Sequence, residues 1–582
     1  MKCKKLLVAL SVILSVSMLA GCGQGAGKTA DDNGTTNQTT EKTAEKTDLT
    51  SKIVKTYEAT DMSKSPAAAT DRKDTLVIGT SAPDGVLNPL FMEGAYDFYI
   101  TETMFAPLMA PTKDGEMEDY LTESNSVSED GLTYTFKIKK DANWSDDTPI
   151  TAKDVDLGIK IVCDSTYTGP LDYITGRVKI KGAQEYKDGK SDSISGIKID
   201  DDKTISITLE DKSSSALYVL GSAYPVNSDY YGKYYKQGNT DGIKETYTNP
   251  GPSSGAYKFV SYKTGQEVVL EANDKFILGA PKIKNLIYKV TTDPVKLQML
   301  QSGDIDLTDL TVSQDNVESV ESLGFAGYQL FPTNGYGYIA FNEAKPQFKD
   351  KAVRQALAIG LNREKVVSSV FNSYAKVINV PQAEASWAYS AGKNDYKYDL
   401  EAAKKMLDDA GWKVGSDGIR EKDGVKLTIN FTGTSDNDVV DSILSVADSD
   451  WKELGVKFTS EKMDFTSMRE KQKGGDWDML FMAWGLVSDA NDSDVYKTGG
   501  SQNKTNYSNA KADEIYDKIK SELDKDKLKE LYKELYTELN EDLPYIYMYQ
   551  RSDMWANNGR IKGLDNSPYV HYTYNLYKAT IE

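Results

Sequence analysis

The stretch Asp141–Val155, which reads DANWSDDTPITAKDV, holds the most informative local pattern in the chain. Trp144 is a large apolar side chain that must find a pocket, and residues 145–148 are turn formers whose short polar side chains bond to nearby backbone. Thr151 and Asp154 have the spacing of a capping box, the hydrogen-bonded pair that opens a helix. The residues alone therefore predict a well-capped surface corner: a strand end, a turn and a helix start.

The same stretch closely resembles the signature W-S-D-G-x-P-x-T-A-x-D-V of the extracellular solute-binding proteins of peptide/nickel ABC importers. Asp147 stands where that signature has glycine. Other segments resemble the family in the same order along the chain: G-x-Y-x-F in 255–259, G-D-I-D in 303–306 and V-R-Q-A-L at the start of 353–367. The resemblance covers the chain from about Asp74 to its C-terminus.

The resemblance implies an α/β, periplasmic-binding-protein-like bilobal fold, with two α/β lobes, a hinge of crossing strands and an extra β-rich domain. Alternating apolar residues in 133–138 and 197–209 agree with that β-rich domain. Repeated chain crossings between the lobes let a hinge bend without disrupting either core. The expected boundaries are 74–105, 246–330 and 541–582 for domain I, 106–245 for the β-rich domain II, and 331–540 for domain III, the second lobe.

Composition bounds the function. A chain of 582 residues with 39% hydrophobic and 10% aromatic residues is long enough for about two to four domains. Its net charge of −19 argues against binding to nucleic acid or to an anionic membrane surface. The single histidine, His571, excludes histidine-rich metal sites and any catalytic apparatus that needs two histidines, so we expect it to be structural or exposed. No metal, no cofactor and no enzymatic activity are predicted.

The N-terminus has the pattern of a lipoprotein signal. Lysines among the first five residues precede an apolar run at 6–20, which is too short to remain as a membrane-spanning helix. The run ends in L-A-G-C at 19–22, which resembles the lipobox of bacterial lipoproteins. We predict a signal peptide at 1–21, lipidation of Cys22 and a flexible tether at 22–73, where few large apolar residues can offset the entropy of ordering. Such an anchor would place the protein at the extracytoplasmic face of the cell membrane.

Cysteine usage predicts a chain without intrachain disulfides. Cys3 would leave with the signal peptide and Cys22 would carry lipid, so only Cys163 remains. Cys163 follows Ile161 and Val162 on an apolar face, and we expect a small buried side chain there. Stability must then come from packing.

In the oligopeptide binders of this family, the ligand lies extended between the lobes, gripped by main-chain hydrogen bonds, with its side chains in hydrated pockets. A W-x-x-D segment near the peptide's amino end corresponds here to Trp484–Asp489, with the aspartate two positions later. The resemblance implies that Asp489 is the counter-charge for a ligand ammonium, with Asp492 and Asp494 as competing carboxylates and a solvated acidic loop as the plain alternative. The other candidate ligand contacts are Trp484, Ser488, Asn88, Tyr545 and Tyr547.

The predicted function is capture of short peptides by lobe closure, and their delivery to the permease and cytoplasmic ATPase subunits of an ABC importer, by a monomer. Oligosaccharides stay open as ligands because 37 tyrosines can supply aromatic platforms. Nickel and haem are further rivals, although one histidine argues against direct ligation of nickel. A peptide-sensing surface receptor of the same fold and a glycosidase with paired carboxylates are alternatives from other classes, and the importer motifs argue against the second.

Overall fold

The computed structural model describes residues 54–582. The predicted signal peptide, Cys22 and the tether as far as residue 53 lie outside the described residues. From residue 54 onward, no helix is both long and apolar enough to span a bilayer. In that same part of the chain, no three histidine, cysteine or carboxylate side chains are arranged to bind a metal ion.

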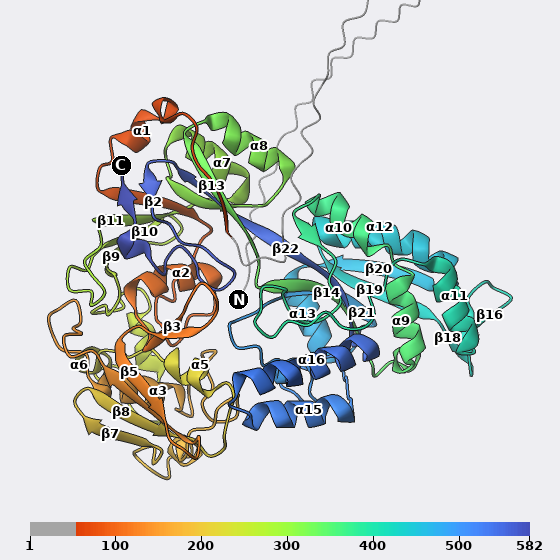
Figure 1. The fold of residues 1–582 in the computed structure, drawn as a ribbon, viewed down its shortest axis with the longest axis horizontal. Coiled ribbons are helices and arrows are strands. Elements are labelled where there is room, and N and C mark those ends of the chain that lie inside the picture. The colour runs from red at the N-terminus through yellow and green to blue at the C-terminus, as the bar shows by residue number, and fades with distance from the viewer. Residues whose placement is uncertain (1–53) are drawn as a thin grey trace, which may run out of the picture. The chain divides into compact units, whose positions relative to one another are not determined.

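Two lobes share one 13-stranded sheet, and strand β22 (Tyr545–Asn558) runs through both of them (Figure 1). The first half of β22 pairs with β14 (Gly335–Phe341) in the second lobe. Its second half pairs with β12 (Leu307–Leu310) and β13 (Ala326–Pro332) in the first lobe. Because β13 and β14 are consecutive in the chain but lie in different lobes, a second crossing falls between them. The predicted hinge of crossing strands is therefore present.

The first lobe contains the parallel pairs of β2 with β11 and with β12, and its helices α2, α7 and α8 contact the sheet. The remaining elements of this lobe are β1 (Lys55–Tyr57), η1 (Met62–Lys64), α1 (Ala67–Thr70), β2 (Thr75–Thr80), α2 (Ala95–Met104), β9 (Tyr257–Lys263), β10 (Glu267–Ala272), β11 (Asn285–Val290), α7 (Asp293–Ser302), α8 (Gln314–Leu323), β23 (Ile561–Lys562), η4 (Leu576–Lys578) and β24 (Thr580–Ile581).

Domain II extends the first lobe with an antiparallel sheet in the order β5-β6-β8-β7. Its elements are β3 (Met109–Pro111), β4 (Met117–Asp119), β5 (Thr122–Val127), β6 (Thr133–Ile138), α3 (Ala152–Val162), α4 (Ala183–Lys187), β7 (Ile197–Asp201), β8 (Thr204–Thr208), α5 (Ala216–Gly221), α6 (Ser228–Tyr231) and η2 (Asp241–Thr246).

The second lobe carries the sheet order β20-β19-β21-β14-β22. Beyond β14, its elements are η3 (Pro346–Lys349), α9 (Lys351–Ile359), α10 (Arg363–Phe371), β15 (Ala375–Lys376), α11 (Leu400–Asp409), β16 (Lys413–Val414), β17 (Arg420–Lys422), β18 (Val425–Lys426), β19 (Thr428–Thr434), α12 (Asp438–Glu453), β20 (Lys457–Met463), α13 (Phe465–Gly474), β21 (Met479–Gly485), α14 (Ser493–Tyr496), α15 (Ala510–Ser521) and α16 (Lys525–Asp542).

The corner predicted at 141–155 forms as expected. Trp144 is 1% exposed and its indole donates to the Asp154 carboxylate over 3.3 Å. The same carboxylate accepts the Thr151 backbone N–H at 2.7 Å, which completes the capping box at the start of α3. Asp147 has a φ of 71°, the left-handed conformation that glycine adopts without strain and that aspartate tolerates. The turn is therefore compatible with the glycine of the family signature.

Two expected boundaries differ from the structure. Residues 55–57, assigned to the tether, instead pair with β13, and Tyr57 stacks on Tyr328 with ring centroids 4.5 Å apart. The segment 541–582, assigned to domain I, begins in the second lobe, because Tyr545–Tyr549 pair with β14 before the chain crosses. Composition does not reveal either boundary, because β1 is only three residues long and β22 belongs to both lobes.

Two arginines from the V-R-Q-A-L motif region secure β22. Arg354 contacts the Asp542 carboxylate at 2.8 Å and the Leu543 carbonyl at 3.2 Å, just before the strand begins. Arg363 donates to the Tyr547 carbonyl at 2.6 Å, within the strand. Both side chains are almost fully buried. In this chain the motif arginines stabilise the crossing strand.

Candidate ligand-binding site

A cavity of about 910 Å³ lies where the two lobes face each other. Its walls come from α2 and the C-terminal segment 567–574 of the first lobe, from residues 218–224 of domain II, and from β14 and β21 of the second lobe. The hinge residues Thr333, Asn334 and Arg551 also line it. Ligand sites are typically concave and mostly apolar with a few placed polar groups, and this cavity has that character.

Strand β21 presents a free edge to the cavity. Its pairing with β14 continues to Gly485, whereas its pairing with β19 on the other side ends at Leu480. Among the described residues, no strand pairs with that second edge from Phe481 to Gly485. Ala483 and Gly485 are exposed and line the cavity. An extended ligand can therefore add to this edge through backbone hydrogen bonds.

Aromatic rings cover much of the wall. Trp484 stacks against Tyr338 with ring centroids 6.2 Å apart. Across the cavity, the Tyr120 and Tyr574 rings lie 5.7 Å apart, and His571 lies edge-on to Phe98 at 5.9 Å. Rings of this kind offer large contact areas that accept many side chains.

The charged groups that line the cavity are mostly acidic: Glu93, Glu102 and Asp553 against the one guanidinium of Arg551. Arg551 lies 3.5 Å from Asp553. Burial raises the pKa of the Glu102 carboxyl to about 7, although a hydrogen bond from Thr573 opposes the shift. Burial lowers the pKa of His571 to about 4, so its imidazole is neutral at physiological pH. The charged side chains that line the cavity therefore have a net negative charge. His571, which we expected to be structural or exposed, lies in the cavity wall.

Asp489, the expected counter-charge, does not line this cavity. Its carboxylate lies 3.0 Å from the guanidinium of Arg177, which belongs to domain II. Asp494 lies 3.4 Å from the same guanidinium. Although burial opposes the charged form, these two carboxylates raise the pKa of Arg177. The Trp484–Asp489 segment therefore contacts the first lobe through an ion pair. The side chain of Asp489 is 7% exposed, so Asp489 is not a solvated loop residue.

Asp492, the other competing carboxylate, lies near this pair and also outside the cavity wall. One of its oxygens accepts a hydrogen bond from Tyr516 at 2.7 Å. Burial raises its pKa to about 7, and the hydrogen bond from Tyr516 only partly offsets this. Its position is that of an acid packed into the second lobe.

The other predicted site residues divide into two groups. Trp484 and Ser488 line the cavity, and the Ser488 carbonyl accepts a hydrogen bond from the Trp387 indole at 3.2 Å. Asn88 is fully buried, and its side chain accepts the Leu90 backbone N–H at 2.9 Å. Asn88 therefore organises the turn before α2 and lies behind the wall.

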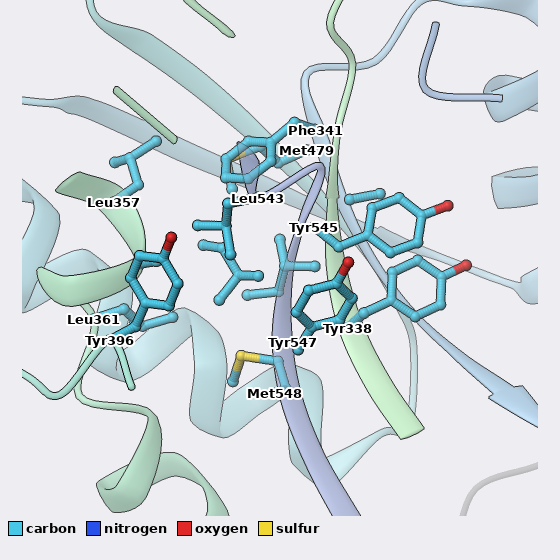
Figure 2. Packing of buried hydrophobic residues seen from close by; sticks show 14 of the residues in the cluster. Tyr338, Phe341, Leu357, Leu361, Tyr396, Met479, Leu543, Tyr545, Tyr547 and Met548 are labelled. Carbon is cyan, nitrogen blue, oxygen red and sulfur yellow. The ribbon is translucent and has the colours of Figure 1, made fainter. Parts of the chain in front are cut away.

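Tyr545 and Tyr547 belong to the core of the second lobe, as Figure 2 shows for their packing beside Tyr338 and Met548. The rings of Tyr545 and Tyr338 stack with centroids 4.3 Å apart. Tyr338 in turn stacks against Trp484, so Tyr545 supports the cavity wall from behind. Tyr549 lines the cavity instead. In a regular strand, residues two apart lie on the same face. Here the pairing of β22 with β14 has a bulge between Tyr547 and Tyr549, and Met548 has no partner on β14. The side chains of Tyr547 and Tyr549 therefore do not share one face.

Taken together, the crossing strands, the cavity between the lobes and the free strand edge define a bilobal solute-binding protein. A sequence profile of the "Bacterial extracellular solute-binding proteins, family 5 Middle" matches residues 116–506. The chain belongs to this family, whose members act outside the cytoplasm.

Relatives and solved structures agree with that assignment. The oligopeptide-binding protein AppA of Bacillus subtilis is 26% identical over 533 residues, covering 89% of this chain and 93% of the relative. The structure of AppA in complex with a nonapeptide aligns with a TM-score of 0.72 at 25% identity, over 88% of this chain and 99% of that one. NikZ of Campylobacter jejuni in complex with Ni(L-His) aligns with a TM-score of 0.71 at 24% identity, over 87% and 99%. The last likeness concerns the fold alone.

Proposed function

We propose that this protein captures oligopeptides in the cavity between its lobes and delivers them to an ABC importer, from a lipid anchor at Cys22. The observation that supports a peptide most directly is the free edge of β21, which lines the cavity from Ala483 to Gly485. Backbone pairing at such an edge grips any extended peptide regardless of its side chains. The oligopeptide-binding relatives support the same ligand class.

The cavity also suits varied side chains. Rings such as Trp484 and Tyr549 provide contact area, while the volume of about 910 Å³ leaves room for water to fill gaps around smaller residues. A sugar would use the same rings but has no strand of amides to pair with β21. The proposal includes no catalytic step.

Closure of the lobes around the peptide is part of the proposal. Bending at the two strand crossings would bring β21 and α2 together, and the Arg177–Asp489 pair, which joins domain II to the second lobe in this structure, would hold the lobes in the closed arrangement. Small-angle scattering should show a smaller radius of gyration with saturating peptide than without it. An unchanged radius would argue against closure and leave peptide binding standing.

The test of peptide capture starts from the full mature chain. Native mass spectrometry of protein purified gently from bacterial cells identifies the co-purified ligand, and calorimetry then compares a synthetic copy with copies carrying one N-methylated amide each. Strand addition predicts losses of about 10-fold or more at alternate positions, because successive amides of a strand point in opposite directions. A flat profile would contradict strand addition. A co-purified oligosaccharide, haem or metal complex would contradict a peptide ligand.

The importer role needs a separate measurement. Uptake of the identified peptide by cells should depend on the protein and on the permease and ATPase subunits. If peptide binding persists while uptake is unaffected by loss of the protein, a sensing receptor of the same fold is the better assignment.

A further inference from the structure

Glu102 is an isolated carboxylate in the wall of the cavity. It lies in the last turn of α2 (Ala95–Met104) and accepts a hydrogen bond from the Thr573 hydroxyl. Within residues 54–582, no lysine, arginine or histidine nitrogen lies within 4.0 Å of it. The one guanidinium in the wall, Arg551, is next to Asp553, and His571 is neutral at physiological pH. Glu102 therefore has no cation of its own.

This position is costly for a carboxylate. The C-terminal end of a helix carries partial negative charge, which disfavours an anion in the last turn. The last turn of α2 contains no basic residue to compensate. Burial in the cavity wall disfavours the ionised form further. A residue that lowers stability where it stands, and that faces a ligand cavity, is typical of a functional site.

The surroundings of Glu102 suit a cation. Tyr99, Tyr120 and Tyr224 are close enough for its charge to add to the effect of burial in raising the pKa of each phenol. These phenols stay protonated at physiological pH, so they add no charge. Aromatic faces attract ammonium and guanidinium groups, with a gain that grows when the cation is desolvated. Because Tyr120 and Tyr224 line the same cavity as Glu102, the carboxylate can supply an ion-pair partner and these rings can supply apolar contact to one bound cation.

We propose that Glu102 is the residue that binds a cationic group of the peptide ligand and makes the protein prefer positively charged peptides. This inference rests on the proposed peptide-binding function and assigns the ammonium-binding role to the first lobe, because Asp489 is already paired with Arg177. The bound cation is the α-ammonium of the peptide or the side chain of a lysine or arginine residue. Each of these groups is a positively charged N–H donor.

The experiment uses the full mature chain and three kinds of synthetic pentapeptide built on one alanine- and phenylalanine-based sequence. The first kind is acetylated and neutral, the second is an acetylated series with a single lysine at each position in turn, and the third has a free α-amine. Calorimetry should show that Glu102→Gln weakens the best lysine peptide or the free-amine peptide by about 10- to 100-fold, and changes the neutral peptide by less than about 3-fold. Which charged peptide loses affinity identifies the source of the cation.

Glu129→Gln is the matched control. Glu129 is exposed in domain II and lies outside the cavity wall, so its replacement removes the same charge from the protein without touching the site. It should change the affinities for all the peptides by less than about 3-fold. Equal affinities of the charged peptides for wild type and Glu102→Gln, or a larger loss in Glu129→Gln, would overturn the inference while leaving peptide binding intact. If wild type binds none of the peptides, the proposed function fails together with it.

A second readout separates binding from folding. Because the carboxylate lowers stability, Glu102→Gln should unfold at a higher temperature than wild type in the absence of ligand. A variant that is both more stable and weaker toward charged peptides has lost a binding group, not its fold. A variant that is less stable would argue for a structural role of Glu102.

Discussion

Arg177 of domain II and Asp489 of the second lobe form an ion pair, with 3.0 Å between Nη1 and Oδ2. Asp494 adds a second carboxylate to the same guanidinium. The pair joins segments from opposite lobes, and it uses the aspartate that the family resemblance assigns to a ligand ammonium. A carboxylate with a guanidinium already bound has less to offer a ligand cation.

The first prediction separates these two roles of Asp489. Asp489→Asn should change the affinity for a free-amine peptide and for its acetylated copy by the same factor, because the lost contact joins lobes and does not touch the ligand. Calorimetry on both peptides measures this, and Arg177→Gln should give the same pattern. A loss confined to the free-amine peptide would show that Asp489 binds the ammonium after all.

The second prediction concerns the crossing strand. Arg354→Met should lower the free energy of unfolding by about 3–5 kcal/mol, since it leaves the carboxylates of Asp542 and Glu343 without their partner near the start of β22. Lys351→Met is the control on the same helix, because the pair of Lys351 with Glu541 is exposed and should contribute less than about 1 kcal/mol. Denaturant unfolding followed by circular dichroism gives both values. Similar losses in the two variants would contradict the role of Arg354.

The third prediction is a pH dependence of stability. The pKa of Glu102 is raised from about 4.5 in the unfolded chain to about 7 in the fold, so the folded state binds this proton more tightly. Wild type should therefore lose stability relative to Glu102→Gln as the pH rises from about 5 to about 7.5, by about 1–3 kcal/mol in total. Unfolding measured at several pH values tests this.

Other groups near Glu102 do not produce that difference. The phenols of Tyr99, Tyr120 and Tyr224 titrate above this range, and His571 titrates near pH 4. Burial raises the pKa of Asp553 as well, but that carboxyl is present in both proteins and cancels in the comparison. A stability difference that does not vary with pH would show that Glu102 is not the titrating group.

The fourth prediction concerns the anchor. Cys22→Ala should release the protein from membranes, because the acyl chains that would bury their methylene groups in the bilayer are lost. Fractionation of cells that express wild type and variant measures the membrane-bound share. Equal membrane association of both would refute lipidation at Cys22.

The sequence predicts the local structure best where one short stretch contains all the interacting groups. The corner around Trp144 forms as predicted, because it depends on residues within a few positions of one another. Cys163 is buried as predicted. The family motifs also predict the bilobal fold and its crossing strands.

The site is less predictable because it depends on contacts between distant parts of the chain. Asp489 and Arg177 come from different lobes, and nothing near either residue in the sequence indicates the pair. Tyr549 replaces Tyr547 in the wall because of a bulge, which the alternation of residues does not reveal. The sequence contains only a weak indication that Glu102 is functional, because an acid in the last turn of a helix interacts unfavourably with the helix dipole. That indication points to a binding site only when the position of the cavity is known.

Amide hydrogen exchange can show whether a peptide adds to the free edge of β21. Full mature protein is exchanged with and without saturating peptide, and fragments that cover 479–487 are followed by mass spectrometry. Strand addition predicts slower exchange of amides between Phe481 and Gly485 when peptide is bound, because the N–H groups on the free edge acquire partners. Unchanged exchange in this strand under saturating peptide, with protection elsewhere, would rule out strand addition at β21.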